Sequence, residues 1–215
     1  TYTLPKIEKK AILLILSCTK GNITNQVRNE YQLSHGNPEN MLCDENSKFP
    51  KQTMVLGVIA STGDAMPPYY FKDARVDHMA YIRAMKSHGI PWMTKVANGR
   101  PYVFQQDGTH AHTAKKILEF LEANCCDFHP PDFWPPSSPD LNPMDFFCWS
   151  IIEAKANDPK HGTQCALKRA IMSAFKNLDP TTFQKACPCM QLHAEAIVAN
   201  NAILLNNLKI YVKTK

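Results

Sequence analysis

The sequence has no hydrophobic run long enough to cross a membrane. Its longest run of aliphatic side chains, residues 11–16, has six residues, whereas a membrane helix needs about 20. The chain also carries little net charge, because 24 Lys and Arg against 19 Asp and Glu give +5 at pH 7. So small a charge permits a polyanionic partner without requiring one. We therefore expect no membrane partner, and charge alone does not decide the function.

The eight cysteines lack the spacing of a disulfide or zinc framework. No signal-peptide pattern precedes them and no C-x-x-C pair occurs. Cys187 and Cys189 flank Pro188 as a close pair, but no further Cys or His stands at a matching spacing. G-x-G-x-x-G, P-loop and G-x-S-x-G motifs are absent as well. We interpret the cysteines as free thiols of an intracellular, reducing compartment.

Strand and helix patterns alternate along the 215 residues, which suffice for one sizeable domain or two small ones. Apolar and β-branched runs predict strands at residues 10–17, 53–60 and 102–106. Helical spacing of apolar side chains and capping residues predict helices from Asp77 to about residue 87, after Thr113, after Asn142-Pro143, over 163–177, and from 179 toward 207 with an interruption at Pro188. The fold class predicted is α/β with a helical C-terminal end.

Residues 103–113, V-F-Q-Q-D-G-T-H-A-H-T, are the first informative segment. Asp107 follows a predicted buried strand, and a carboxylate at the carboxyl end of such a strand is well placed to bind a metal ion. Asp-Gly is also a common turn dipeptide, and taken alone the segment favours a simple turn.

Residues 134–145, W-P-P-S-S-P-D-L-N-P-M-D, give the first segment its context. The pattern Q-Q-D-x-x-x-A-H-T followed by this proline-rich motif resembles the mariner-like DNA transposases. A weaker resemblance extends from about Leu14 to Ile210.

The resemblance implies a ribonuclease H-like fold, with a mixed central sheet flanked by helices, over residues 1–215. It also implies an acidic triad that binds two Mg²⁺ (or Mn²⁺) ions for DNA cleavage and strand transfer. Asp107 matches the second acid and Asp145 the third, whereas Asp140 belongs to the proline-rich turn and Glu153 is too far along the helix to share a metal ion with them. DNA, a second copy or an intact transposase would be the partner, in the nucleus. Relatives carry helix-turn-helix modules, which we expect to be missing from this chain.

The first acid departs from the family pattern. The segment that resembles S-D-E-K reads Ser17-Cys18-Thr19-Lys20, so Cys18 stands where the first Asp is expected. Asp44-Glu45 imitates the motif, but no apolar strand precedes it. A thiol is a soft ligand, whereas Mg²⁺ prefers hard oxygen, and we therefore expect impaired cleavage. The alternatives are a non-catalytic remnant that binds nucleic acid, and a defective gene copy.

The remaining candidates surround the predicted site. His112 matches the family, whereas His110 replaces a proline, and for both we favour a role in loop ordering or DNA contact. Lys115 and Lys116 could neutralise phosphates, although a solvated helix face is the simpler interpretation. Trp149 is expected to pack against the protein interior rather than against a base.

Overall fold

The computed structural model describes residues 52–73, 75–107, 112–130, 139–157, 161 and 163–199, together with the backbone of 13–24. His110, Asp44 and Glu45 lie outside these residues. The elements are, in chain order, β1 (Leu13–Thr24), β2 (Gln52–Ala60), β3 (Tyr69–Tyr70), α1 (His78–Ala84), α2 (Ile90–Ala97), β4 (Tyr102–Gln106), α3 (Lys115–Asn124), α4 (Trp149–Asn157), α5 (Gln164–Lys176) and α6 (Pro180–Ala199). The predicted α/β class is confirmed.

The strands form one mixed sheet in the order β3-β2-β1-β4. β1 pairs antiparallel with β2 and parallel with β4, so it is an interior strand. The strands predicted at 53–60 and 102–106 are confirmed. The predicted 10–17 strand is too short at its far end, because β1 continues to Thr24 through a register shift between Lys20 and Ile23.

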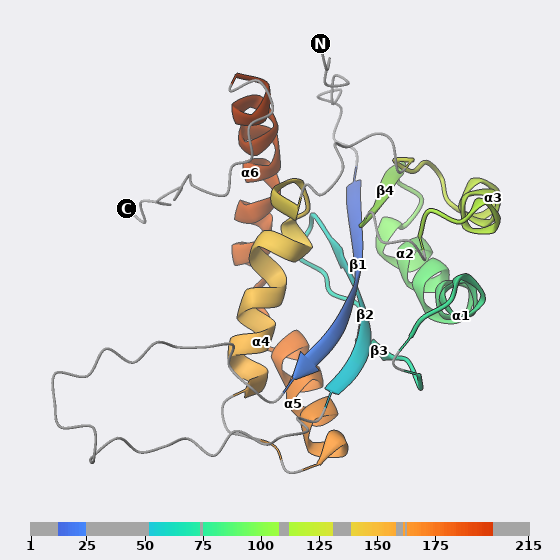
Figure 1. Cartoon of the computed structure of the whole chain (residues 1–215). Helices are drawn as coiled ribbons and strands as arrows, with labels where there is room; N and C mark the ends of the chain where they lie inside the picture. The colour runs from blue at the N-terminus through green and yellow to red at the C-terminus, as the bar shows by residue number, and fades with distance from the viewer. Residues whose placement is uncertain are drawn as a thin grey trace, which may run out of the picture.

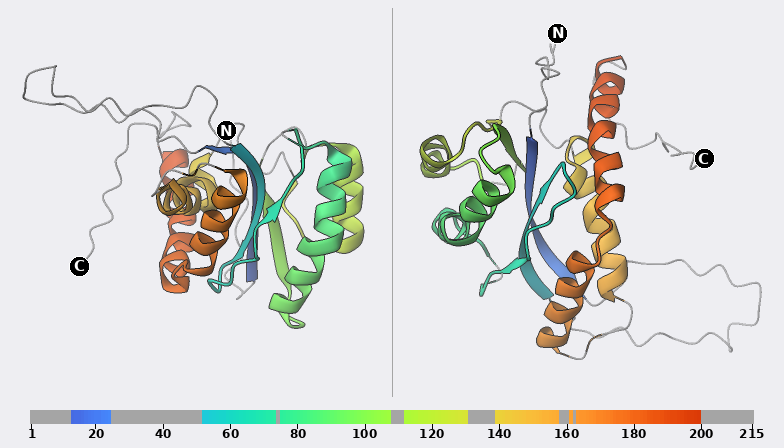
Figure 2. Two further views of the ribbon diagram at one scale, coloured as in Figure 1. Left: turned by 90° about the horizontal axis from the view of Figure 1, so that it is seen from below. Right: turned by 180° about the vertical axis from the view of Figure 1, so that it is seen from behind.

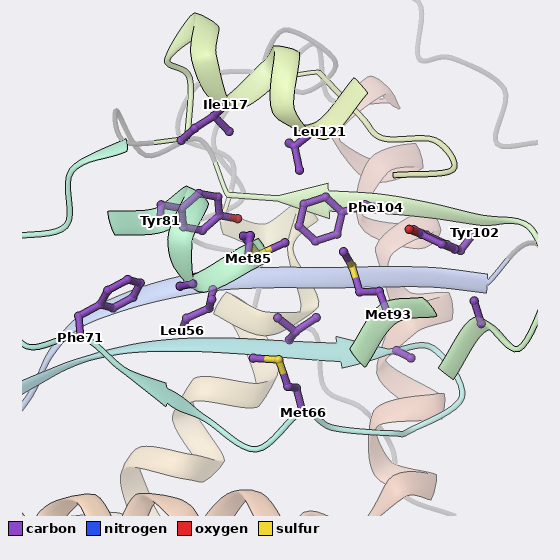
Figure 3. Close-up of a cluster of buried hydrophobic side chains, with 14 residues drawn as sticks. Leu56, Met66, Phe71, Tyr81, Met85, Met93, Tyr102, Phe104, Ile117 and Leu121 are labelled. Carbon is purple, nitrogen blue, oxygen red and sulfur yellow. The ribbon is translucent and has the colours of Figure 1, made fainter. Parts of the chain in front are cut away.

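Helices cover both faces of the sheet, with α1, α2 and α3 on one side and α4, α5 and α6 on the other (Figures 1 and 2). The first side encloses a core built around Leu56, Tyr81, Met93 and Phe104 (Figure 3). The second core contains Trp149 and side chains from α5. The predicted mixed sheet between helices is therefore confirmed, and none of the described helices is both long and apolar enough to span a bilayer.

The helix predicted from Asp77 starts as expected but does not end near residue 87. Asp77 caps it, since the Ala80 N–H donates to Asp77 Oδ1 at 2.6 Å. A π-helical turn, Met85–Gly89, then joins α1 directly to α2. Met93, two turns beyond Met85, is fully buried, so the apolar stripe that holds the helix to the core continues past the predicted end. The helix stops at Asn98, which adopts a left-handed φ of 48°.

Of three further predictions of where helices begin or break, two are wrong and one is confirmed. Thr113 does not cap α3, whose N-cap position is Ala114 without a side-chain hydrogen bond. Pro188 does not interrupt α6, because buried Phe183 and Met190 anchor the helix on both sides of it. Thr163 caps α5 through the Ala166 N–H, at 3.2 Å. The predicted continuation of α6 toward residue 207 lies outside the described residues.

Candidate active site

The strand register brings residue 18 next to Asp107. In the parallel pair of β1 and β4, Ser17 lies opposite Gln106. One further step along both chains places residue 18 beside residue 107, at the carboxyl end of β4. The sequence pattern predicted both residues for one site, and that assignment stays a prediction; the register shows that they are neighbours.

Residue 18 lies on the face of the sheet that α4 and α5 cover. Its antiparallel partner in β2 is Gly57, and directly opposed residues of neighbouring strands share a face. A Cβ at Gly57 would lie only 2.9 Å from Met144 Cε and 3.2 Å from Trp149 Cη2. Position 18 is therefore on the side of the sheet against which the segment carrying Asp145 packs.

Asp145 lies on a π-helical turn, Met144–Cys148, that contacts β1 and continues into α4. Such turns re-aim side chains and are frequent at functional sites. Asn142, 5% exposed, fixes the start of the turn. Its Oδ1 accepts from the Met144 N–H at 3.1 Å, and its Nδ2 donates to Asp145 Oδ2 at 2.8 Å. The 3₁₀ turn Pro139–Leu141, which contains Asp140, precedes it, in line with the prediction that Asp140 belongs to the proline-rich turn.

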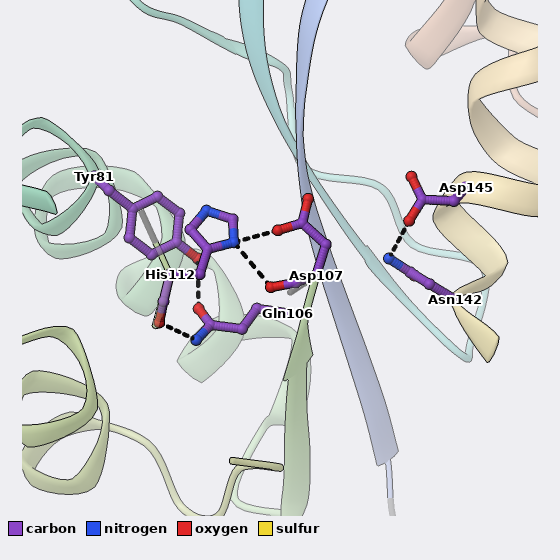
Figure 4. Close-up of polar contacts among 6 residues, drawn as sticks. All are labelled: Tyr81, Gln106, Asp107, His112, Asn142 and Asp145. Carbon is purple, nitrogen blue, oxygen red and sulfur yellow. Dashed lines mark hydrogen bonds and ion pairs between the residues drawn. The ribbon is translucent and has the colours of Figure 1, made fainter. Parts of the chain in front are cut away.

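Asp107 is paired with a buried histidine (Figure 4). The His112 side chain has no exposed surface, and its Nδ1 contacts both Asp107 Oδ1 and, at 3.2 Å, the Asp107 carbonyl oxygen. Both partners are acceptors, so Nδ1 must carry the proton that it donates. The Tyr81 ring lies over the imidazole with centroids 4.2 Å apart. His112 thus holds the carboxylate from the α1 side of the sheet.

Asp107 and Asp145 lie on opposite sides of β1 in Figure 4. Asp107 is almost buried, with 11% of its side chain exposed. Among the residues whose side chains are described, no three His, Cys, Asp or Glu form a group able to hold a metal ion. Of the residues predicted to bind metal, those whose side chains are described are therefore two carboxylates, Asp107 and Asp145.

The other sequence candidates are two lysines of α3 and a tryptophan of α4. Lys115 and Lys116 are exposed on the first turn of α3, where Lys115 Nζ is 3.8 Å from Glu119 Oε1. Trp149 is fully buried and meets Phe175 edge to face, as predicted for a packing residue.

Sequence reasoning missed the residues that support the two acids, which are Tyr81, Gln105, Gln106, His129 and Asn142. Gln105 and Gln106 stand next to Asp107 in the motif, and their polarity inside a buried strand was a usable signal. Tyr81 and His129 come from distant elements, and no sequence spacing pointed to them. Burial lowers the pKa of His129 to about 4, so this ring is neutral near pH 7.

Comparison with characterised proteins gives consistent matches to transposases. The chain is 34% identical to the Tcb2 transposase of Caenorhabditis briggsae over 92 residues, which is 43% of this chain and 32% of that protein. It is 26% identical to the Tc1 transposase of Caenorhabditis elegans over 148 residues, or 69% of this chain and 52% of Tc1. No protein-family model matches the chain. In sequence the chain is therefore similar to transposases of transposable elements.

Solved structures of the Mos1 mariner transposase have the same fold. The Mos1 paired end complex with Mn superposes with a TM-score of 0.73 at 18% identity, over 89% of this chain and 56% of Mos1. The isolated Mos1 catalytic domain gives a TM-score of 0.65 at 15% identity and is covered over 83% of its length. The ribonuclease H-like fold predicted from the sequence is therefore confirmed. The chain spans about a third to a half of the transposases that it matches in sequence.

Proposed function

We propose that this chain is a transposase catalytic domain of the mariner type whose metal-dependent DNA cleavage is impaired by Cys18. The single observation that carries the proposal is the register that sets residue 18 beside Asp107, on the face against which the Asp145 turn packs. That position is where a third metal-binding carboxylate would belong. A cysteine there removes one anionic ligand from the site.

The donor set fits a divalent cation at two positions and not at the third. Asp107 and Asp145 supply carboxylate oxygens, which Mg²⁺ and Mn²⁺ prefer, whereas a thiol favours softer metals. When bound, a pair of such ions stabilises the charge on the attacking and leaving oxygens at phosphorus. His112 orients the Asp107 carboxylate, and Asn142 orients that of Asp145. With Cys18 in place, the remaining ligands bind metal weakly and the cut is slow.

DNA is the proposed partner. Lys115 and Lys116 are exposed cations on α3, two and three residues beyond Thr113 and close in sequence to the buried His112. Exposed cations that follow the Asp107 segment in the chain are suited to bind a phosphate backbone. A nuclear location and pairing with a second copy or an intact transposase follow from the same proposal.

The test is the reversion Cys18→Asp, assayed by nicking of supercoiled duplex DNA in Mg²⁺ and in Mn²⁺. Loss of a group one step removed from the metal already costs about 10- to 100-fold in activity. We therefore expect the reversion, which restores a ligand, to raise the nicking rate more than about 100-fold. Cys18→Ser is the matched control, because it changes sulfur to oxygen without adding a charge, and it should leave the rate low.

Two outcomes would redirect the assignment. Equal nicking by the native and reverted proteins would contradict the impairment. Salt-dependent DNA binding with no cleavage by either protein would instead favour a nucleic-acid-binding remnant that does not cut, the second function that Cys18 suggests.

A further inference from the structure

The last two residues of β4 are glutamines, and their side chains form hydrogen bonds on opposite faces of the sheet. Consecutive residues of a strand point to opposite faces. Gln105, 2% exposed, donates from Nε2 to the Leu141 carbonyl oxygen at 3.2 Å, on the α4 side. Gln106 donates from Nε2 to the His112 carbonyl oxygen at 3.0 Å, on the α1 side (Figure 4).

Gln106 belongs to a chain of contacts that ends on Asp107. The Tyr81 hydroxyl donates to Gln106 Oε1 at 3.2 Å, and the Tyr81 ring covers the His112 imidazole. Gln106 fixes the His112 backbone, Tyr81 fixes the ring, and the ring donates to Asp107. The Asp107 carboxylate thus takes its orientation from a residue of α1, 26 positions upstream in the sequence.

Gln105 belongs to a second chain of contacts that ends on Asp145. Leu141, which accepts from Gln105, closes the 3₁₀ turn and directly precedes Asn142. Asn142 holds Asp145 twice, through Nδ2 to Oδ2 and through its carbonyl oxygen to the Asp145 N–H, both at 2.8 Å. On the other side of Gln105, His129 Nδ1 approaches Oε1 at 3.4 Å. The buried amide therefore ties β4, which leads into Asp107, to the 3₁₀ turn that leads into the Asp145 turn.

We propose that Gln105 and Gln106 are positioning residues, one for each of the two carboxylates. This inference rests on the proposed metal-dependent function. Each amide is the link between β4 and the group that orients one acid, so the pair sets where the two carboxylates lie relative to one another. Residues that orient metal ligands through hydrogen bonds are required for affinity as well as for activity.

The experiment measures Mn²⁺ affinity by calorimetric titration with MnCl₂, on the full chain carrying Cys18→Asp. The test variants are Gln105→Met and Gln106→Met, which keep much of the side-chain volume and remove both hydrogen-bonding groups. Gln164→Met is the matched control: Gln164 is exposed on α5, and its amide donates to the Gln52 carbonyl oxygen at 3.0 Å, away from the acids. Melting in EDTA reports the stability of the metal-free fold for each variant.

Each test substitution is expected to raise the Mn²⁺ dissociation constant roughly 10- to 100-fold. The Gln164→Met control should change it by less than about twofold. Tyr81→Phe keeps the ring over His112 and loses only the hydroxyl, so it should weaken binding less than Gln106→Met. In a protein that already carries Gln106→Met, Tyr81→Phe should weaken Mn²⁺ binding little further, because both residues belong to the same chain of contacts. In a protein that carries Gln105→Met, the two effects on the dissociation constant should add, because Tyr81 and Gln105 belong to different chains of contacts.

The two proposals fail in different ways. Mn²⁺ binding that Asp107→Asn abolishes and both glutamine variants leave unchanged would overturn the positioning role and leave the metal site standing. Weaker Mn²⁺ binding that matches the loss of melting temperature in EDTA would also overturn the positioning role, because the amides would then act only on the fold. If a glutamine variant does not fold, Tyr81→Phe, which keeps its packing, allows the same comparison of Mn²⁺ affinity with melting temperature. No Mn²⁺ binding by the Cys18→Asp protein would overturn both proposals.

Discussion

Replacing Gly57 with alanine should destabilise the protein by crowding the contact between the sheet and α4. Gly57 is buried in β2, and a Cβ there would lie 2.9 Å from Met144 Cε, 3.1 Å from Phe175 Cζ and 3.2 Å from Trp149 Cη2. Ordinary contacts begin near 3.4 Å, so these atoms must move away by between 0.2 and 0.5 Å. Met144 and Trp149 are fully buried and Phe175 is 4% exposed, which leaves little room for that movement.

The expected change in the free energy of unfolding follows from two opposing effects. Overpacking a tight core costs about 1 to 3 kcal/mol, and replacing a glycine within a strand returns about 0.5 to 1 kcal/mol of backbone entropy. We expect a net loss of about 1 to 2 kcal/mol, which lowers Tm by about 2 to 8 °C for a chain of this size. Urea unfolding followed by tryptophan fluorescence measures it, because Trp149 lies in the crowded contact.

Shortening Met144 provides the internal control. In the Met144→Ala protein the 2.9 Å contact is absent, so Gly57→Ala should cost less there than in the native chain, with a coupling of roughly 0.5 kcal/mol or more. Gly99→Ala should cost the same in both proteins. Gly99 has φ of 76° and open space around its Cβ position, so its penalty comes from the backbone. Gly57→Ala that is neutral, or that costs the same with either residue at 144, would refute the crowding argument.

Two further predictions concern titration and reactivity. Burial lowers the pKa of His129 from 6.5 to about 4. Between these pH values His129 is therefore protonated in the unfolded chain and neutral in the folded chain. Stability should therefore fall by roughly 1 to 2 kcal/mol as pH drops from 6.5 toward 4, and urea titrations of His129→Gln should show a shallower fall; an identical pH dependence would contradict it. Burial also raises the pKa of the Cys148 thiol to about 12, whereas Cys126 and Cys165 are exposed. Iodoacetamide at pH 8, read by peptide mass spectrometry, should label the two exposed thiols while Cys148 reacts only after unfolding, and equal labelling in the native protein would contradict this order.

The sequence predicted those elements whose pattern is local. β4 lies where the run of residues 102–106 placed it, and Asp77 and Thr163 cap their helices because a cap depends on three or four neighbouring residues. The errors come from long-range packing. The helix from Asp77 runs on to Ala97 and α6 runs through Pro188, since each has buried side chains on both sides of its predicted break.

The site divides in the same way. The motifs singled out Asp107 and Asp145 and noted the cysteine at position 18, and the strand register makes residues 18 and 107 neighbours. Tyr81 could not be predicted as a support of the site, because it reaches Gln106 only once α1 packs on the sheet. The two-residue β3 was also missed, since so short a strand carries no periodicity.

β1 is hydrogen-bonded along both of its edges, to β2 and to β4, and this ladder is made of backbone groups that every residue except proline supplies. If position 18 holds a metal ligand as proposed, an inherited change there would stop the chemistry and leave the sheet intact. A lineage of such genes would go on producing well-folded but inert proteins, and selection on folding alone would not remove them.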